Sequence, residues 1–360
     1  MSVQAVTARD VLGRLAEFDT VIDARSPAEY AEDHLPGAEN WPVLDDDERR
    51  EVGTEYKQVS AFDAKKRGAA LVARRIAEHL EQRVLDRPRE WRPLVYCWRG
   101  GKRSGTLAWF LDQIGFRTHV IDGGYKAFRA AVVEALQALP GRFDYVVICG
   151  RTGSGKTRLL QALADEGAQV LDLEALACHR GSVLGALPGR PQPTQKAYDT
   201  AVWHALSRFD PARPVFVESE SKKVGNLRVP EALIERMREH GRCVALEVPD
   251  AARVRLLLED YRHLTEDPEA LCRQLDALVE LRGRDVVGAW HAQARAGRFA
   301  ELFLDLMQRH YDPIYTRSME RNFRGLAHAE VLRLPDADPD ALRAAARSLL
   351  ARDALPTTAG

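Results

Sequence analysis

The segment that most constrains the fold is a glycine-rich loop at residues 150–157, which reads Gly-Arg-Thr-Gly-Ser-Gly-Lys-Thr. It follows an apolar run at 145–149 and precedes a stretch with helical periodicity at 156–166. The pattern matches the phosphate-binding P-loop in the strand-to-helix context that this motif requires. In such a loop, backbone N–H groups enclose a phosphate at the N-terminus of a helix. The loop therefore predicts an α/β domain with a parallel sheet.

Six residues of this loop are predicted to bind a diphosphate: Gly150, Gly153, Ser154, Gly155, Lys156 and Thr157. The Lys156 ammonium would reach the outward oxygens, and the Thr157 hydroxyl could ligate Mg²⁺. Hydrolysis of a nucleotide would also need a carboxylate at the end of a neighbouring strand. The candidates are Asp172, Glu174, Glu218 and Glu220. None follows the usual run of four apolar residues that ends in aspartate, so a diphosphate other than a nucleotide is also considered.

A second anion-binding turn surrounds Cys97, which follows an apolar run at 93–96. Glycines let successive amides converge on an anion, and a helix predicted from residue 104 would point its positive end at the sulfur. Nearby cations and a helix N-terminus favour the thiolate, which is the nucleophilic form. We therefore predict that Cys97 is catalytic, rather than a buried structural cysteine. The residues predicted to bind the donor anion are Arg99, Gly100, Gly101, Lys102 and Arg103.

The sequence around and before Cys97 resembles a rhodanese domain. An apolar run that ends in Asp-x-Arg lies within 19–30, and His-Leu-Pro-Gly-Ala-Glu-Asn follows at 34–40. Residues 118–125 resemble the strand and turn that come after the catalytic helix. The resemblance covers about residues 10–138, and it implies that Cys97 carries a chalcogen.

The spacing of the loop differs from that of many single-domain rhodaneses. Five residues separate Cys97 from Arg103, whereas four are common in that family. Five is also the spacing of cysteine-dependent phosphatases, whose loop encloses a tetrahedral phosphate. Those enzymes normally place histidine before the cysteine, and here the residue is Tyr96. The larger loop therefore favours a tetrahedral, phosphate-sized donor anion over hydrolysis of a phosphoester.

The chain of 360 residues is long enough for two domains, and its formal net charge is −1. Near-neutral charge argues neither for nor against nucleic acid. Five scattered cysteines without a Cys-x-x-Cys pair argue against a disulfide framework and a zinc site, and no haem is expected. The first residues show no basic-then-apolar signal and no apolar run could span a bilayer, so we expect a cytoplasmic protein without a membrane partner.

Alternating strands and helices predict a rhodanese-like domain at 1–138, a linker at 139–144 and a P-loop domain at 145–350. The P-loop domain would include a helical extension at about 250–325, and 351–360 would be a frayed tail. The predicted strands are 20–24, 93–97, 118–122, 145–149, 169–173, 215–219 and 243–248. The predicted helices are 65–86, 104–115, 125–138, 156–166, 196–209 and 230–240.

Several segments together resemble the bacterial tRNA 2-selenouridine synthase family over essentially the whole chain: 96–104, 150–157, 172–185, 192–195 and 218–225. The resemblance implies replacement of sulfur by selenium at C2 of a wobble 2-thiouridine in tRNA, with selenophosphate as donor. It also implies an S-geranyl-2-thiouridine intermediate formed from geranyl diphosphate. Cys97 would accept selenium as a selenylsulfide, and Arg99 and Arg103 would hold the donor phosphate.

The family resemblance also suggests contacts to tRNA or substrate, for which plain solvated or packing roles are the alternative. The candidates are Trp98, Arg180, Ser182, Lys222 and Lys223. The partner would be tRNA that bears a wobble 2-thiouridine, and we expect a monomer. The main alternative function is a rhodanese-type sulfurtransferase coupled to an ATPase or kinase domain. A phosphate-sensing module with a redox-regulatory Cys97 is a further alternative, and Tyr96 disfavours a phosphatase.

Overall fold

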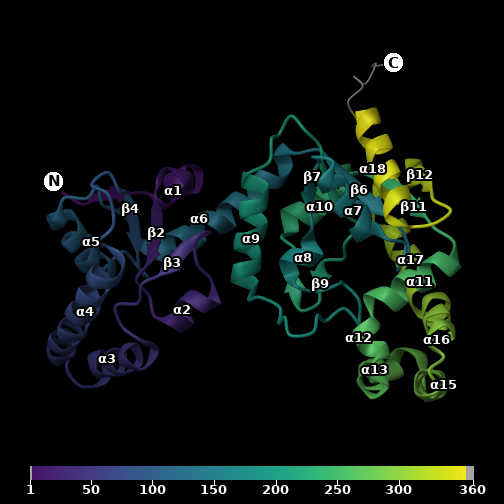
Figure 1. The fold of residues 1–360 in the computed structure, drawn as a ribbon, viewed down its shortest axis with the longest axis horizontal. Helices are drawn as coiled ribbons and strands as arrows, with labels where there is room; N and C mark the ends of the chain where they lie inside the picture. The colour runs from purple at the N-terminus through teal and green to yellow at the C-terminus, as the bar shows by residue number, and fades with distance from the viewer. Residues whose placement is uncertain (1, 354–360) are drawn as a thin grey trace. The chain divides into compact units, whose positions relative to one another are not determined.

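The computed structural model describes residues 2–353 and contains two compact units (Figure 1). The first unit comprises Met1–Leu136 and Pro193–Ser207, and the second comprises Gln137–Gln192 and Arg208–Gly360. Each unit is built on a five-stranded sheet in which every paired strand is parallel. The predicted α/β class with parallel sheets is therefore confirmed.

The sheet of the first unit has the strand order β1-β5-β4-β2-β3. Its strands are β1 (Gln4–Val6), β2 (Thr20–Asp23), β3 (Ala38–Asn40), β4 (Pro93–Tyr96) and β5 (His119–Ile121). Its helices are α1 (Ala8–Arg14), α2 (Pro27–Glu32), α3 (Asp46–Gln58), α4 (Ala61–Arg83), α5 (Lys102–Ile114) and α6 (Gly124–Ala138). All four residues of β4 are buried, as expected for the central strand of a parallel sheet that is covered on both faces. The short strands β1 and β3 were not predicted.

Helix α9 (Gln195–Ser207) belongs to the first unit although its sequence follows the P-loop. The Thr200 hydroxyl donates a hydrogen bond of 3.1 Å to buried Asp33, which also accepts one of 2.7 Å from the Tyr125 hydroxyl. The rings of Phe128 and Trp203 pack edge to face, with centroids 5.8 Å apart. The predicted helix at 196–209 therefore forms, but its contacts differ from the expected assignment of all of 145–350 to one domain. The linker at 139–144 stays a prediction.

The sheet of the second unit has the strand order β7-β8-β6-β11-β12. Its strands are β6 (Tyr145–Cys149), β7 (Gln169–Leu171), β8 (Val215–Glu218), β11 (Arg242–Glu247) and β12 (Glu330–Arg333). Helices α7 (Lys156–Asp165) and α18 (Pro339–Asp353) share one hydrophobic core with this sheet. The remaining elements before residue 250 are α8 (Leu173–Ala177), the hairpin of β9 (Lys223–Val224) and β10 (Leu227–Arg228), and α10 (Glu231–His240). Neither β12 nor α18 was predicted.

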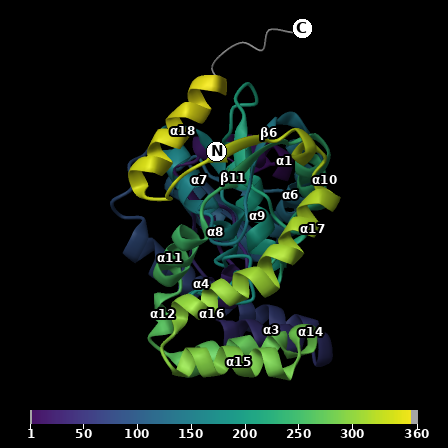
Figure 2. The ribbon, with the colours of Figure 1, turned by 90° about the vertical axis from the view of Figure 1, so that its right-hand side faces the viewer.

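Residues 250–322 are helical, as predicted, and form a second hydrophobic core around Trp290 and Phe303. The helices are α11 (Asp250–Asp260), α12 (Arg262–Thr265), α13 (Pro268–Leu275), α14 (Val279–Arg282), α15 (Arg284–Arg295), α16 (Phe299–Leu306) and α17 (Asp312–Asn322). A π-helical segment, Met307–Tyr311, joins α16 to α17 without a break (Figure 2). Insertions of this kind often occur at functional sites, because they change the direction of the side chains that follow.

None of the helices within residues 2–353 combines the length and the apolar character that crossing a bilayer requires. The tail predicted at 351–360 lies outside the described residues from 354 onward.

Candidate functional site

Cys97 lies directly after the central strand β4, at the carboxyl edge of a parallel sheet, where α/β proteins place ligand sites. Its side chain is 3% exposed. Gly101 is the N-cap of α5, and because glycine has no side chain, it offers no side-chain cap to the free amides of that helix. Gly100 has a φ of +64°, and a Cβ atom there would come within 2.8 Å of the Ile121 carbonyl oxygen. The loop therefore requires glycine at this position, as the sequence suggested.

The start of α6 supports the cysteine loop from behind. The Tyr125 N–H donates to the Cys97 carbonyl at 2.8 Å, and the Lys126 N–H donates to the Trp98 carbonyl at 2.9 Å. A Cβ atom on Gly124 would lie only 2.3 Å from the Cys97 carbonyl oxygen. Gly124 therefore allows α6 to approach the loop closely. Its role was not predicted, although the Gly-Gly-Tyr sequence at 123–125 was a detectable signal.

Ser104 contacts the sulfur directly, and the sequence analysis did not identify it. Its hydroxyl donates a hydrogen bond of 3.0 Å to Cys97 Sγ, and it also lies 3.3 Å from the Gly101 carbonyl oxygen. The Ser104 side chain is 1% exposed, so no water competes for this contact. A donated hydrogen bond stabilises a thiolate more than a thiol, because the negative charge strengthens it.

Replacing Ser104 with alanine is expected to slow alkylation of Cys97 by iodoacetamide about tenfold at neutral pH, which corresponds to one hydrogen bond to a charged acceptor. The alkylated peptide can be quantified by mass spectrometry over time. Thr106→Ala is the matched control, since the Thr106 hydroxyl lies on the same helix and bonds to a backbone carbonyl instead. Equal rates in the two variants would contradict a role of Ser104 at the sulfur.

The predicted anion-binding side chains differ in their surroundings. The Arg103 guanidinium forms an ion pair of 2.7 Å with Glu29, and both side chains are largely buried. Burial is the largest single influence and acts to raise the pKa of Glu29, but the hydrogen bond and charge of Arg103, with smaller contributions from Ser26 and Arg49, together lower the net pKa. Arg99 and Lys102 are exposed. The Trp98 ring is tilted against the Tyr125 ring, with centroids 5.5 Å apart.

Tyr96 occupies the place of the phosphatase histidine but is a core residue. It is fully buried, and its hydroxyl accepts a hydrogen bond of 3.2 Å from the Leu35 N–H. Burial raises the pKa of Tyr96 well above its ordinary value, so the phenol stays protonated. The side chain therefore supports the fold behind the loop and supplies no proton acceptor to Cys97.

The P-loop joins β6 to α7 and lines one side of a cavity of about 360 Å³. Of the six predicted diphosphate-binding residues, four line this cavity: Gly153, Gly155, Lys156 and Thr157. Gly150 and Ser154 do not line it. The Gly150 N–H donates to the Tyr315 hydroxyl at 2.7 Å, and Ser154 is buried against Gly150. These two residues therefore shape the loop from inside the protein.

Three of the four candidate carboxylates meet beside Lys156. The oxygens of Glu174, Glu218 and Glu220 lie within 4.8 Å of one another and face the cavity. Buried Glu218 Oε1 has no hydrogen-bond partner. Asp172 instead caps α8, where it accepts a hydrogen bond of 2.8 Å from the Ala175 N–H. Carboxylate oxygens are the ligands that Mg²⁺ prefers, so the three glutamates fit a divalent cation next to a bound diphosphate.

The carboxylates of this cluster repel one another, and the Lys156 ammonium attracts them. Burial, followed by repulsion from Glu218, raises the pKa of Glu220 to about 8. Burial also raises the pKa of Glu174 and of Glu218. Burial acts to lower the pKa of Lys156, but Tyr315 and the glutamates raise it overall, so the ammonium stays charged. The site thus combines a charged ammonium with three carboxylates whose pKa values are all raised.

Without divalent cations, the affinity for inorganic pyrophosphate is expected to fall as the pH rises through about 8. Below that pH the neutral Glu220 carboxyl does not repel the anion, and above it the carboxylate does. Titration calorimetry between pH 6.5 and 9.5 would measure the change. Glu220→Gln should flatten the profile, whereas Glu235→Gln, on the exposed side of α10, should not. A profile in Glu220→Gln as steep as that of the native chain would contradict the assignment.

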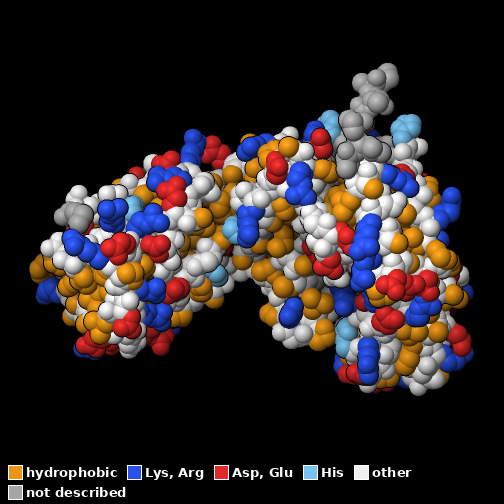
Figure 3. Space-filling view, turned by 45° about the horizontal axis from the view of Figure 1, so that its top comes forward, with side chains coloured by type: hydrophobic (Ala, Val, Ile, Leu, Met, Phe, Trp, Pro, Cys, Tyr) orange, Lys and Arg blue, Asp and Glu red, His pale blue; other side chains and the backbone are white. Residues whose placement is uncertain are grey.

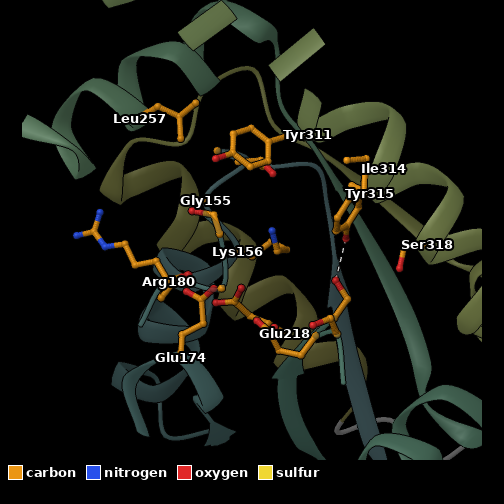
Figure 4. A pocket seen from close by; sticks show the side chains of 18 of the residues that line it. Gly155, Lys156, Glu174, Arg180, Glu218, Leu257, Tyr311, Ile314, Tyr315 and Ser318 are labelled. Carbon is orange, nitrogen blue, oxygen red and sulfur yellow. Dashed lines mark hydrogen bonds between the residues drawn. The ribbon is translucent and has the colours of Figure 1, made fainter. Parts of the chain in front are cut away.

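The opposite side of the cavity is apolar and aromatic. Figure 4 shows Leu257, Tyr311, Ile314 and Tyr315 across the cavity from the two labelled glutamates. Further apolar side chains that line it are Val183, Met319 and Phe323. Most of these residues come from α11, α17 and the π-helical segment between α16 and α17. The sequence analysis missed this wall, because nothing in the local sequence links residues 257–323 to the P-loop.

The helical extension also holds the P-loop in place. Arg253 is 1% exposed, and its Nη2 donates a hydrogen bond of 2.7 Å to the Thr152 carbonyl. The same guanidinium donates to Asp312 on α17, at 2.5 and 2.9 Å. One turn later on α17, the Tyr315 hydroxyl accepts a hydrogen bond from the Gly150 N–H. The same hydroxyl is hydrogen-bonded to the Ser219 hydroxyl at 2.8 Å. The extension therefore fixes both the loop and the apolar wall beside it, which faces the glutamates across the cavity.

Two of the other predicted contact residues lie at the cavity. Arg180 and Ser182 line it. Arg180 donates a hydrogen bond of 2.5 Å to the Asp260 carbonyl, and the Ser182 and Tyr261 hydroxyls are 3.0 Å apart. Lys222 and Lys223 are exposed and do not line the cavity, but they follow Ser221, which does.

A glycine-rich cysteine loop after the central strand of one parallel sheet, and a P-loop with an acidic and an apolar wall on the other, define a protein that joins a rhodanese-like domain to a P-loop domain. Family models match both parts: "Rhodanese-like domain" at residues 7–131 and "tRNA 2-selenouridine synthase AAA domain" at residues 143–283. With the relatives described next, these matches show that the chain belongs to the tRNA 2-selenouridine synthase family.

Two relatives illustrate the extent of the similarity. A tRNA 2-selenouridine synthase of Nitrosomonas europaea is 37% identical over 257 residues, which cover 70% of this chain and 66% of the relative. A tRNA 2-selenouridine synthase of Nitrosomonas eutropha is 31% identical over 377 residues, which cover 89% of this chain and 95% of the relative. A rhodanese-related protein of Thermoplasma volcanium is a solved structure with 18% identity and a TM-score of 0.23, and the match covers 35% of this chain and 89% of that one.

Proposed function

We propose that the chain converts wobble 2-thiouridine of tRNA to 2-selenouridine, with selenophosphate as the selenium donor and S-geranyl-2-thiouridine as the intermediate. The relatives carry the name tRNA 2-selenouridine synthase, which supports tRNA modification as the activity. The observation that carries the geranyl step is the two-sided cavity of the second unit. A P-loop beside carboxylates suits a diphosphate, and an apolar wall opposite suits a prenyl chain.

In the first step, the thiouridine sulfur attacks C1 of geranyl diphosphate, the C1–O bond breaks and pyrophosphate leaves. The base loses its N3 proton, because alkylation of sulfur converts the C2=S group to C2–S. Gly153, Gly155 and Lys156 would hold the leaving pyrophosphate. When bound, Mg²⁺ would neutralise charge on that leaving group, and Glu174, Glu218 and Glu220 together with the Thr157 hydroxyl would hold it.

In the second step, a selenium nucleophile attacks C2, and geranyl thiolate leaves. Alkylation makes this exchange feasible, because a thiolate is a far better leaving group than the sulfur of a thione. Cys97 would be the nucleophile that activates the selenium donor, and Arg99, Lys102 and Arg103 would hold the donor anion with the amides of the loop.

The tRNA would contact Trp98, Arg180, Ser182, Lys222 and Lys223. Figure 3 shows Lys and Arg side chains interspersed with Asp and Glu on the face drawn, in keeping with a net charge of −1. Local basic clusters rather than one broad basic surface would therefore bind the phosphates. The protein would act as a monomer. It would work in the reducing cytoplasm, where the Cys97 thiol stays reduced.

Nucleoside mass spectrometry tests the function most directly. Thiouridine tRNA is incubated with the protein and with geranyl diphosphate, selenophosphate or both. We expect S-geranyl-2-thiouridine with the first donor alone, and 2-selenouridine when both are present. Unchanged thiouridine in every reaction, together with ATP turnover stimulated by thiosulfate, would overturn the proposal in favour of a sulfurtransferase coupled to an ATPase.

A further inference from the structure

The oxidation state of selenium restricts what Cys97 can do in the proposed function, on which this inference rests. Selenium in selenophosphate is at the selenide level. A selenylsulfide on Cys97, as the family resemblance implies, holds selenium that is two electrons more oxidised. That route needs an external oxidant, or it leaves the electron pair of the Se–P bond on phosphorus, which would then depart in reduced form as phosphite rather than phosphate. Attack of the thiolate on phosphorus needs no oxidant, because the selenium leaves with the electron pair of the Se–P bond.

The loop around Cys97 has the features that attack on a tetrahedral phosphorus requires. Within residues 2–353, the amides of residues 98–104 donate no hydrogen bond, so seven consecutive N–H groups are free to bind oxyanions. Four of them precede α5 and three lie in its first turn, where the helix dipole also favours an anion. Such a cradle stabilises the charge that develops on the phosphoryl oxygens during displacement.

The Arg103 guanidinium is already held in one orientation by its ion pair with Glu29. Glu29, the ion-pair partner of Arg103, also accepts a hydrogen bond of 3.2 Å from the Ser26 N–H. This bond fixes the carboxylate at the start of α2. Arg103 therefore presents a guanidinium held by two hydrogen bonds, of 2.7 and 3.4 Å, rather than a free surface charge. A planar guanidinium held in this way can bind two oxygens of a phosphoryl group.

The sulfur lies at the base of the cradle. Cys97 Sγ is within 3.0 Å of the Ser104 hydroxyl, which belongs to the first turn of α5. If the amides of residues 98–104 bind the phosphoryl oxygens, the sulfur at the N-terminus of this helix would lie behind the phosphorus, opposite the leaving selenium. An in-line displacement needs this order of atoms.

We propose that Cys97 cleaves selenophosphate at phosphorus, forms a phosphocysteine and releases selenide as the nucleophile for the tRNA. The Cys97 S–P bond forms, the P–Se bond breaks, and selenium departs with the electron pair and takes up a proton. Water then attacks phosphorus, so that phosphate leaves and the Cys97 thiol returns. Selenide attacks C2 of S-geranyl-2-thiouridine and geranyl thiolate leaves. No atom changes oxidation state in the sequence.

The experiment uses the full chain with selenophosphate, without tRNA, oxygen or any other oxidant. Selenide is trapped with monobromobimane, phosphate is measured in parallel, and acid-quenched samples are digested for mass spectrometry. We expect selenide and phosphate in equal amounts, and a phosphoryl group on the Cys97 peptide. Phosphoryl and selenium adducts have nearly the same nominal mass, so the isotope pattern of selenium distinguishes them.

Cys97→Ala is expected to lower selenide release about 1,000-fold or more, as loss of a catalytic nucleophile does. Cys272→Ala is the matched control, because both thiols are 3% exposed. A selenium-bearing Cys97, equal release from Cys97→Ala, or no release by the native chain would each overturn the proposal. The tRNA assay above is independent of this one. If selenouridine forms but no phosphoryl group is found on Cys97, only the phosphocysteine intermediate is ruled out. Selenide release without any tRNA product would overturn only the proposed function.

Discussion

Replacing Cys97 with alanine is expected to abolish 2-selenouridine formation, with a loss of about 1,000-fold or more, while S-geranylation of the tRNA stays at its native rate. The reason is structural, because Cys97 directly follows β4 in the first unit and the proposed prenyl site is built from residues of the second. Nucleoside mass spectrometry measures both products in one digest. The variant should therefore accumulate S-geranyl-2-thiouridine when both donors are present.

The control for this variant is Cys272→Ala, which removes a thiol of equal burial from the helical extension. It should keep both activities. Circular dichroism would verify that each variant is folded, since both side chains are packed in a hydrophobic core. Retained selenouridine formation in folded Cys97→Ala would rule out the role of this cysteine.

Replacing Lys156 with alanine is expected to weaken binding of geranyl diphosphate about 100-fold and to lower S-geranylation by at least that factor. Lys156 is a charged side chain beside three glutamates, two of which are buried, so its removal leaves the diphosphate facing uncompensated negative charge. Calorimetry with geranyl diphosphate gives the affinity, and nucleoside mass spectrometry gives the rate. The reactivity of Cys97 toward iodoacetamide should not change.

Lys126→Ala is a suitable control, because this exposed lysine lies on α6 of the first unit. It should bind geranyl diphosphate as the native chain does. A native affinity in Lys156→Ala would show that the diphosphate binds elsewhere. ATP should compete weakly with geranyl diphosphate in the native chain, because the wall beside the P-loop offers apolar surface rather than hydrogen bonds to a base.

The loop around Cys97 and the P-loop could both be located from the sequence, because each is a contiguous strand–loop–helix segment; the roles predicted for their residues stay predictions. The backbone amides, the glycines with positive φ and the helix N-terminus that make an anion site all lie within about eight residues. Gly100, Gly153 and Gly155 have the positive φ values that this geometry demands. The buried strands β4 and β6 were equally clear, because central strands of a parallel sheet are continuous apolar runs.

The shape of the second cavity was decided by tertiary structure. Its apolar wall comes from residues 257–323, more than a hundred positions after the P-loop, and its acidic cluster joins Glu174 to Glu218 and Glu220. The periodicity of a helix such as α17 indicates which face is apolar, but not what that face covers. The four carboxylates were equivalent in sequence, and only the turn at the start of α8 made Asp172 a cap.

Tertiary contacts likewise decided that α9 packs in the first unit. Its sequence predicts a helix, and its buried residues Tyr198, Val202 and Trp203 predict an apolar face. That face could have packed on either sheet. Buried hydrogen bonds of Asp33 with Thr200 and Tyr125 stabilise it in the first unit, because a buried carboxylate without partners is costly. Local sequence thus determined the two chemical loops, and long-range packing determined what surrounds them.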